Sequence, residues 1–76
     1  MHRIIYFDSS LGYKGVYIKS EQDLRKKQIE IAKRGNDIIC ITDLDGKTVL
    51  HRFESFTKHA IRINGILTLP ENVLAV

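Results

Sequence analysis

Two strand-forming segments flank a short Asp-Gly turn in the middle of this 76-residue chain, and this pattern limits the fold more than any other feature. The first segment is residues 38–42 (IICIT), the second is residues 48–53 (TVLHRF), and Asp43, Asp45 and Gly46 lie between them. Tight turns favour Asp and Gly, and strands favour β-branched and aromatic residues. We therefore predict a β-hairpin with strands at residues 37–43 and 47–54.

The turn also resembles an enzyme motif. Asp43-Leu44-Asp45-Gly46 after an apolar strand is similar to the first motif of the haloacid dehalogenase phosphatases, where the first Asp attacks phosphate and the second handles the leaving group. In that family Thr follows Gly directly, whereas Lys47 intervenes here. Residues 47–76 are also too few for the crossover helices and later motifs of such a parallel-sheet enzyme. We interpret the segment as a turn.

An amphipathic helix is expected directly before this hairpin. Ser20 is a good N-cap, Asp23 completes a pair similar to a capping box, and Gly35 ends the helix. Its apolar side is expected to pack on a sheet. That side comprises Leu24, Gln28, Ile31 and Gly35, widened by Ile29 and Ala32.

The positive charge of the chain is concentrated in its N-terminal half. Residues 1–36 hold eight Lys/Arg against four Asp/Glu (+4), and residues 37–76 hold four against five (−1). The polar side of the helix could follow a phosphate backbone through Arg25, Lys26, Lys27, Lys33 and Arg34. The alternative is a solvated face, in which carboxylates four residues away neutralise these cations: Asp23–Lys27, Lys26–Glu30 and Glu30–Arg34.

Two further strands are expected before the helix, at residues 2–7 and 14–19. Tyr13 and Tyr17 lie near Lys14 in this region, and aromatic rings between cations can stack on bases while the cations hold phosphates. The alternative is that these tyrosines are half-buried packing residues of a small sheet.

Short strands are expected again after the central hairpin. Residues 60–64 and 66–69 flank Asn64-Gly65, a strong tight-turn signal, and Pro70 ends the second strand. One turn of 3₁₀ helix and a closing strand at residues 73–76 would complete a small β-barrel. The predicted fold class is α+β: an N-terminal β-hairpin and one amphipathic helix, followed by a small antiparallel barrel, all in one domain spanning residues 1–76.

The barrel segment resembles two known families. Residues 69–73 (LPENV) look like the last turn of SH3-like barrels. Residues 46–63 are similar to the Sm-like RNA-binding family of the Hfq type, through Glu54-Ser55-Phe56 and the placement of Gly46 before the second strand. The resemblance implies an Sm-like barrel behind a basic helix, and an Sm-like ring would make the protein a homo-oligomer.

The chain departs from that family at its RNA site. His51 stands where the family has a glycine, Thr57 replaces an acidic residue, and His59 replaces an aromatic that stacks on uridine. The Tyr-Lys-His sequence of the uridine pocket has no counterpart in residues 66–76. The resemblance therefore implies the fold and leaves the RNA site open, and we interpret His59 as an exposed loop residue.

Catalysis, metal binding and cofactor binding are not expected. The three histidines lack metal-ligand spacing and cannot be paired from sequence with a nucleophile and an orienting acid. Cys40, the one cysteine, lies in an apolar run and is expected to be a core residue. No apolar run approaches the roughly 20 residues of a membrane span. We expect a soluble cytoplasmic protein that is not an enzyme.

Two binding roles remain. The first is a nucleic-acid-binding module for single-stranded or structured RNA or DNA, which uses the helix cations with Tyr13, Lys14 and Tyr17. The second is a small regulator or inhibitor, of the kind that phages and other mobile elements carry, which binds a protein partner through a strand edge or an apolar patch. The charge distribution favours the first.

Overall fold

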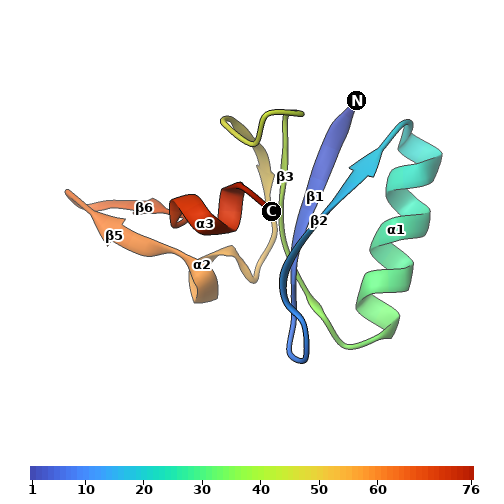
Figure 1. Cartoon of the computed structure of the whole chain (residues 1–76), viewed down its shortest axis with the longest axis horizontal. Coiled ribbons are helices and arrows are strands. Elements are labelled where there is room, and N and C mark those ends of the chain that lie inside the picture. The colour runs from blue at the N-terminus through green and yellow to red at the C-terminus, as the bar shows by residue number, and fades with distance from the viewer.

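A four-stranded antiparallel sheet lies at the centre of the computed structural model, which describes residues 1–76 (Figure 1). The sheet consists of β1 (His2–Asp8), β2 (Gly12–Ile18), β3 (Asp37–Thr42) and β4 (Val49–Arg52) in the order β2-β1-β3-β4. β1 and β3 are the inner strands, and β2 and β4 are the edges. The predicted N-terminal hairpin and the predicted central hairpin are both confirmed.

The inner strands are buried on both faces. Ile4 and Ile5 are neighbours whose side chains point to opposite faces, and both are fully buried. A continuous apolar run is typical of a strand that is covered on both sides. The register of β1 against β3 shifts by one residue after Ile5, and Ile39 and Cys40 both enter the same core cluster.

Helix α1 (Glu21–Lys33) begins and ends where the sequence predicts. The Ser20 side chain accepts a hydrogen bond of 3.2 Å from the backbone N–H of Asp23, which caps the first turn. Gly35 adopts a φ of +75° just after the last turn, a left-handed conformation that glycine tolerates at little cost.

Helix α1 covers one face of the sheet with a narrow apolar stripe. Ile31 is buried and Leu24 is half-buried against a cluster that includes Ile4, from β1. The predicted widening of this stripe is wrong, because Ile29 is 66% exposed and Ala32 is also exposed. The helix forms an outer layer on a single sheet, so only the side that faces the sheet is covered.

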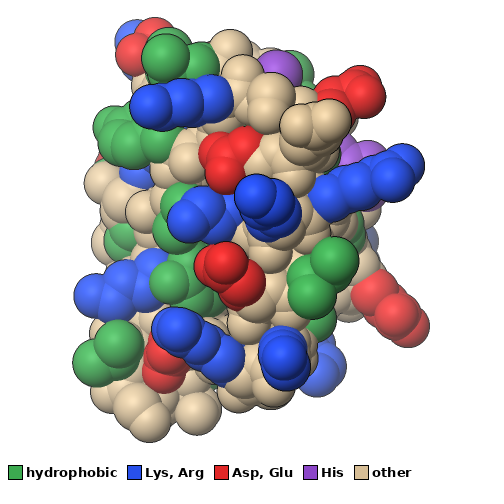
Figure 2. Space-filling model, turned by 90° about the vertical axis from the view of Figure 1, so that its right-hand side faces the viewer, with side chains coloured by type: hydrophobic (Ala, Val, Ile, Leu, Met, Phe, Trp, Pro, Cys, Tyr) green, Lys and Arg blue, Asp and Glu red, His purple; other side chains and the backbone are tan.

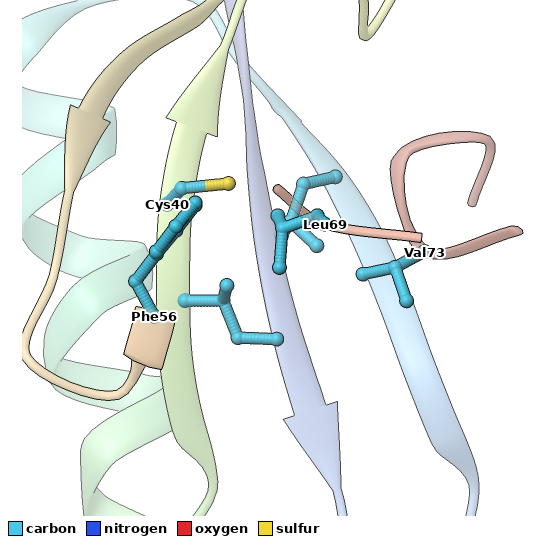
Figure 3. Packing of buried hydrophobic residues seen from close by; sticks show 6 residues of the cluster. Cys40, Phe56, Leu69 and Val73 are labelled. Carbon is cyan, nitrogen blue, oxygen red and sulfur yellow. The ribbon is translucent and has the colours of Figure 1, made fainter. Parts of the chain in front are cut away.

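The C-terminal third of the chain covers the other face. It contains two helical turns, α2 (Phe56–His59) and α3 (Glu71–Leu74), and a small hairpin of β5 (Ile61–Ile63) and β6 (Ile66–Thr68). Figure 3 shows its anchors: Phe56 lies beside Cys40 of β3, and Leu69 and Val73 of the same cluster lie farther across the sheet. All four side chains are buried.

The predicted barrel does not form. β5 and β6 pair only with each other, and no closed barrel is present. A barrel would need a free edge of β3 for its closing strand, but β1 and β4 occupy both edges. The predicted strand at residues 73–76 is also wrong, since α3 follows Pro70 there. The predicted Asn-Gly turn is confirmed, with positive φ at Asn64 and Gly65.

Candidate functional site

The predicted cations of α1 form an exposed basic face. Arg25, Lys26, Lys33 and Arg34 are exposed, and Lys27 is half-buried toward the sheet. Figure 2 looks onto the α1 side and shows Lys and Arg side chains spread over it, with some Asp and Glu among them. We call these five residues the basic face of α1.

The carboxylates of α1 do not pair with these cations. The one contact within 4.0 Å between a basic side chain and a carboxylate joins His59 and Asp37, on another part of the molecule. The three pairs predicted at four-residue spacing are therefore absent. Since nearby carboxylates do not hold them, the ammonium and guanidinium groups are available to an anionic ligand.

A small hollow of about 180 Å³ lies where the end of α1 meets the sheet. Lys27, Glu30 and Arg34 line it from the helix, and Tyr6 and Asn36 line it from the other elements. Its volume is below the roughly 300–1,000 Å³ of small-molecule sites. The hollow is therefore a feature of the basic face and too small for an ordinary substrate.

The alternation of side chains along β2 places the other residues of the predicted nucleic-acid site on different sides of the sheet. Lys14 pairs with Tyr6, whose side chain packs in the core cluster under α1, so Lys14 lies on the same side of the sheet as the basic face. Tyr13 and Tyr17 alternate with it and lie on the opposite side. The structure thus brings Lys14 and α1 to one side and places both tyrosines on the other.

Tyr13 belongs to a chain of hydrogen bonds that the sequence did not indicate. Its hydroxyl lies 2.9 Å from Nδ1 of His59, and Nε2 of His59 lies 3.0 Å from Oδ2 of Asp37. The ring of Phe7 packs on both aromatic partners, with centroids 4.9 Å from Tyr13 and 5.0 Å from His59. We call Tyr13, His59 and Asp37 the polar latch.

The polar latch joins α2 to strands β2 and β3. A carboxylate accepts only, so the Nε2–H of a neutral His59 donates to Asp37, and Nδ1 then accepts a hydrogen bond from the hydroxyl of Tyr13. This order is the one that orients a general base toward a hydroxyl nucleophile. None of the three residues lines the small hollow at the end of α1 or the larger hollow at its start. The contacts therefore satisfy three polar groups and hold the C-terminal third in place.

The prediction that His59 is an exposed loop residue is wrong. Its side chain is 11% exposed. Its partners stand 46 and 22 residues away in the sequence. No local pattern marks contacts over such separations, and only the placement of α2 against the β2 and β3 ends reveals them.

Arg3 is a second residue whose environment the sequence did not indicate. It is 8% exposed, and its Nε has no hydrogen-bond partner. Its guanidinium lies 5.6 Å from the ring centre of Tyr17, a distance at which cation and ring attract. Gly15 and Gly46 give it room, since a Cβ on either residue would come within 3.1 Å of the guanidinium.

A larger hollow of about 410 Å³ opens at the start of α1. Ile18, Leu24 and Ile41 form apolar walls, and His2 and His51 stand among the polar lining residues. This hollow is open, and its volume is in the range of ordinary ligand sites. Neither imidazole has a carboxylate or hydroxyl partner.

Three groups have perturbed acidities. Hydrogen bonds from the backbone N–H groups of Ser10 and Leu11 lower the pKa of Asp8. Desolvation opposes ionisation of Asp43, but several hydrogen bonds, chiefly from the turn backbone, outweigh it and lower the pKa of this carboxyl. Burial raises the pKa of the Cys40 thiol to about 11, which keeps it protonated and unreactive at neutral pH.

No known protein family, no curated protein and no solved structure matches this chain. The resemblance of residues 46–63 to the Sm-like family therefore stays a resemblance of sequence. Nowhere do three or more His, Cys, Asp or Glu side chains gather to hold a metal ion. None of the helices combines the length and apolar character that crossing a bilayer requires.

Proposed function

We propose that this protein is a non-enzymatic module that binds nucleic acid through phosphate contacts of the basic face of α1. Arg25, Lys26, Lys33 and Arg34 are the main contacts, with Lys27 and Lys14 at the margin. The observation that carries the proposal is that the four main contacts are exposed, lie together on the outer helix and its C-cap, and have no carboxylate within 4.0 Å. Neutralising phosphates with such groups releases condensed counterions, which drives binding.

The charge balance of the helix is compatible with this role. Residues 21–34, which are α1 and its C-cap, hold five cations against Glu21, Asp23 and Glu30, a net charge of +2. The carboxylates of Glu21 and Asp23 lie in the first turn, where they interact favourably with the helix dipole. Glu30 is the one carboxylate among the cations of the central and last turns.

The test is fluorescence anisotropy of labelled RNA and DNA with the wild-type protein and two variants. Lys26→Glu with Lys33→Glu reverses two charges on α1, and Lys47→Glu with Lys58→Glu reverses two exposed charges elsewhere. The α1 variant should lose binding and the control should keep most of it, although both change the net charge equally. Equal losses would show that net charge alone acts, and no wild-type binding at low salt would refute the proposal.

A second candidate function is protein binding through the β5–β6 hairpin. Ile61, Ile63 and Ile66 share one face of the hairpin and are 48%, 50% and 64% exposed, while Leu67 on the other face packs on the core. Clustered exposed apolar side chains often mark an interaction site. The hairpin also has only three residues in each strand, so a partner would stabilise it.

Sedimentation velocity over a range of protein concentrations tests the simplest form of this second function, self-association. Ile63→Lys places a charge on the apolar face without touching α1. If the face joins two copies, the wild type should associate as concentration rises and the variant should stay monomeric. A wild type that stays monomeric at every concentration contradicts self-association through this face.

A further inference from the structure

The shape of the basic face and the absence of exposed aromatic rings beside it point to one class of nucleic acid. Single strands are held by proteins that combine a basic groove with aromatic side chains on which bases stack. Among the three Tyr and three Phe of this chain, Tyr17 is the one that is exposed, and it lies on the opposite side of the sheet. Tyr6 and Phe53 on the α1 side are half-buried in the core.

Helix α1 presents an outward ridge of regularly spaced residues. Gln22, Lys26, Ile29 and Lys33 follow one another at intervals of four, three and four, which places them along one line of an α-helix. All four are exposed, and they lie opposite the buried side of the helix. Figure 1 shows α1 as the outermost element on its side of the sheet.

The remaining exposed charges stand on either side of this ridge. Because each residue turns the helix by about 100°, Arg25 and Arg34 fall on opposite flanks of the line through Lys26 and Lys33. Glu30 lies between the ridge and the Arg34 flank and is exposed. A ligand that follows the ridge can therefore meet an arginine on each side.

We propose that α1 docks in the major groove of B-form duplex DNA, with Ile29 toward the groove floor and with Arg25, Lys26, Lys33 and Arg34 reaching phosphates along its two walls. This inference rests on the proposed nucleic-acid function. An α-helix with its side chains is about 10–12 Å across, and the B-DNA major groove is about 12 Å wide. The major groove of A-form RNA is too deep and narrow for side chains to read.

The test uses four labelled probes of one sequence and about 20 nucleotides or base pairs, longer than one helical turn of about 10 base pairs. These are duplex DNA, single-stranded DNA, duplex RNA and single-stranded RNA. Duplex DNA should bind most tightly, and a dye that occupies the major groove should displace the protein whereas a minor-groove ligand should not. Tighter binding to a single strand or to duplex RNA, or displacement only by the minor-groove ligand, would overturn the inference.

Salt dependence gives a second, quantitative readout. Four phosphate contacts predict a slope of about −3.6 in log affinity against log salt, which is roughly a hundredfold loss between about 50 and 200 mM. Lys26→Gln with Lys33→Gln should make the slope shallower by about 1.8, and Lys47→Gln with Lys58→Gln should leave it unchanged. An unchanged slope in the α1 variant would contradict docking through this ridge.

The two proposals fail in different ways. If none of the four probes binds at the lower salt, the nucleic-acid function itself is refuted. If probes bind but duplex DNA is not preferred, the basic face keeps its function and only the major-groove geometry is lost. Tyr17→Ala serves as a further control, because major-groove docking predicts no effect, whereas stacking of bases on the far side of the sheet predicts weaker single-strand binding.

Discussion

Gly46 offers the most direct test of how the C-terminal third packs on the sheet. Gly46 is buried in the turn between β3 and β4 and has a φ of +71°. A Cβ at this position would overlap the backbone carbonyl oxygen of Leu74 in α3 and would lie 3.1 Å from Nη1 of Arg3. Gly46→Ala therefore adds one methyl group at a point where backbone meets backbone.

The cost of Gly46→Ala has two parts. A non-glycine residue in the left-handed region costs about 1–2 kcal/mol. The carbonyl of Leu74 cannot rotate away as a side chain would, so α3 must shift and expose part of Val73, which is 1% exposed. Full burial of a Val contributes about 1.5–3 kcal/mol, so the total loss should be about 2–5 kcal/mol.

Gly35→Ala is the matched control. Gly35 has a φ of +75°, close to that of Gly46, but no atom lies within 4 Å of its added Cβ. This variant should lose only the conformational part, about 1–2 kcal/mol. The difference between the two variants therefore isolates the contact with α3.

Urea unfolding monitored by far-ultraviolet circular dichroism measures both losses. A chain of this size has only a few kcal/mol of net stability, so Gly46→Ala should be partly unfolded even without urea. If the two variants lose the same free energy of unfolding within about 0.5 kcal/mol, α3 does not pack against the turn as described.

Four further predictions concern single side chains. Tyr13→Phe should lower the free energy of unfolding by about 1 kcal/mol, because Nδ1 of His59 loses its donor, and no change would show that the hydrogen bond is absent in solution. Arg3→Met should leave stability unchanged or raise it by about 1 kcal/mol, since it removes a buried cation with an unpaired Nε. A clear decrease in Tm would instead show that Arg3 has a stabilising partner in solution. Because the pKa of the Asp43 carboxyl is lowered from 3.8, the stability that it contributes is present above pH 3.8 and is lost as pH falls through the pKa of the folded state. Asp43→Asn should therefore reduce the decrease in Tm below about pH 4, and a decrease equal to that of the wild type would contradict this. Since burial raises the pKa of Cys40 from 9.0 to about 11, stability should fall as pH rises through this interval, and alkylation at neutral pH should accelerate only in unfolding concentrations of urea; fast labelling of the folded protein would contradict its burial.

The elements that could be predicted are those with local signals. Ser20 and Gly35 mark the ends of α1 because capping and left-handed termination act within a few residues. The turns at Asp43–Gly46 and Asn64-Gly65 were predictable because few residue types adopt their backbone angles. The cations of α1 were predictable as an exposed group because the apolar residues Leu24 and Ile31 fix which side faces the sheet.

The errors concern contacts between segments that are distant in sequence. The barrel prediction failed because it treated residues 37–76 as a unit, whereas β3 pairs with β1, whose partner residues lie at least 30 positions away in the sequence. The polar latch was missed for the same reason, since it joins β2, β3 and α2. The ion pairs considered along α1 are absent for a different reason. Four-residue spacing permits such pairs, but surface pairs contribute too little free energy to hold long side chains in one geometry.

The arrangement of layers separates the groups that maintain the fold from those proposed to bind. The polar latch, Cys40 and the contact between Gly46 and α3 all lie on the face of the sheet that α1 does not cover. The basic face of α1 lies on the opposite outer surface, and α1 contributes only Leu24 and Ile31 to the core cluster beneath it. Lys26 and Lys33 are exposed, and substitutions at such positions usually change the free energy of unfolding by less than about 0.5 kcal/mol. Charge changes at Lys26 and Lys33 can therefore be read as effects on binding, whereas a loss of binding in a variant of the far face first requires a measurement of its stability.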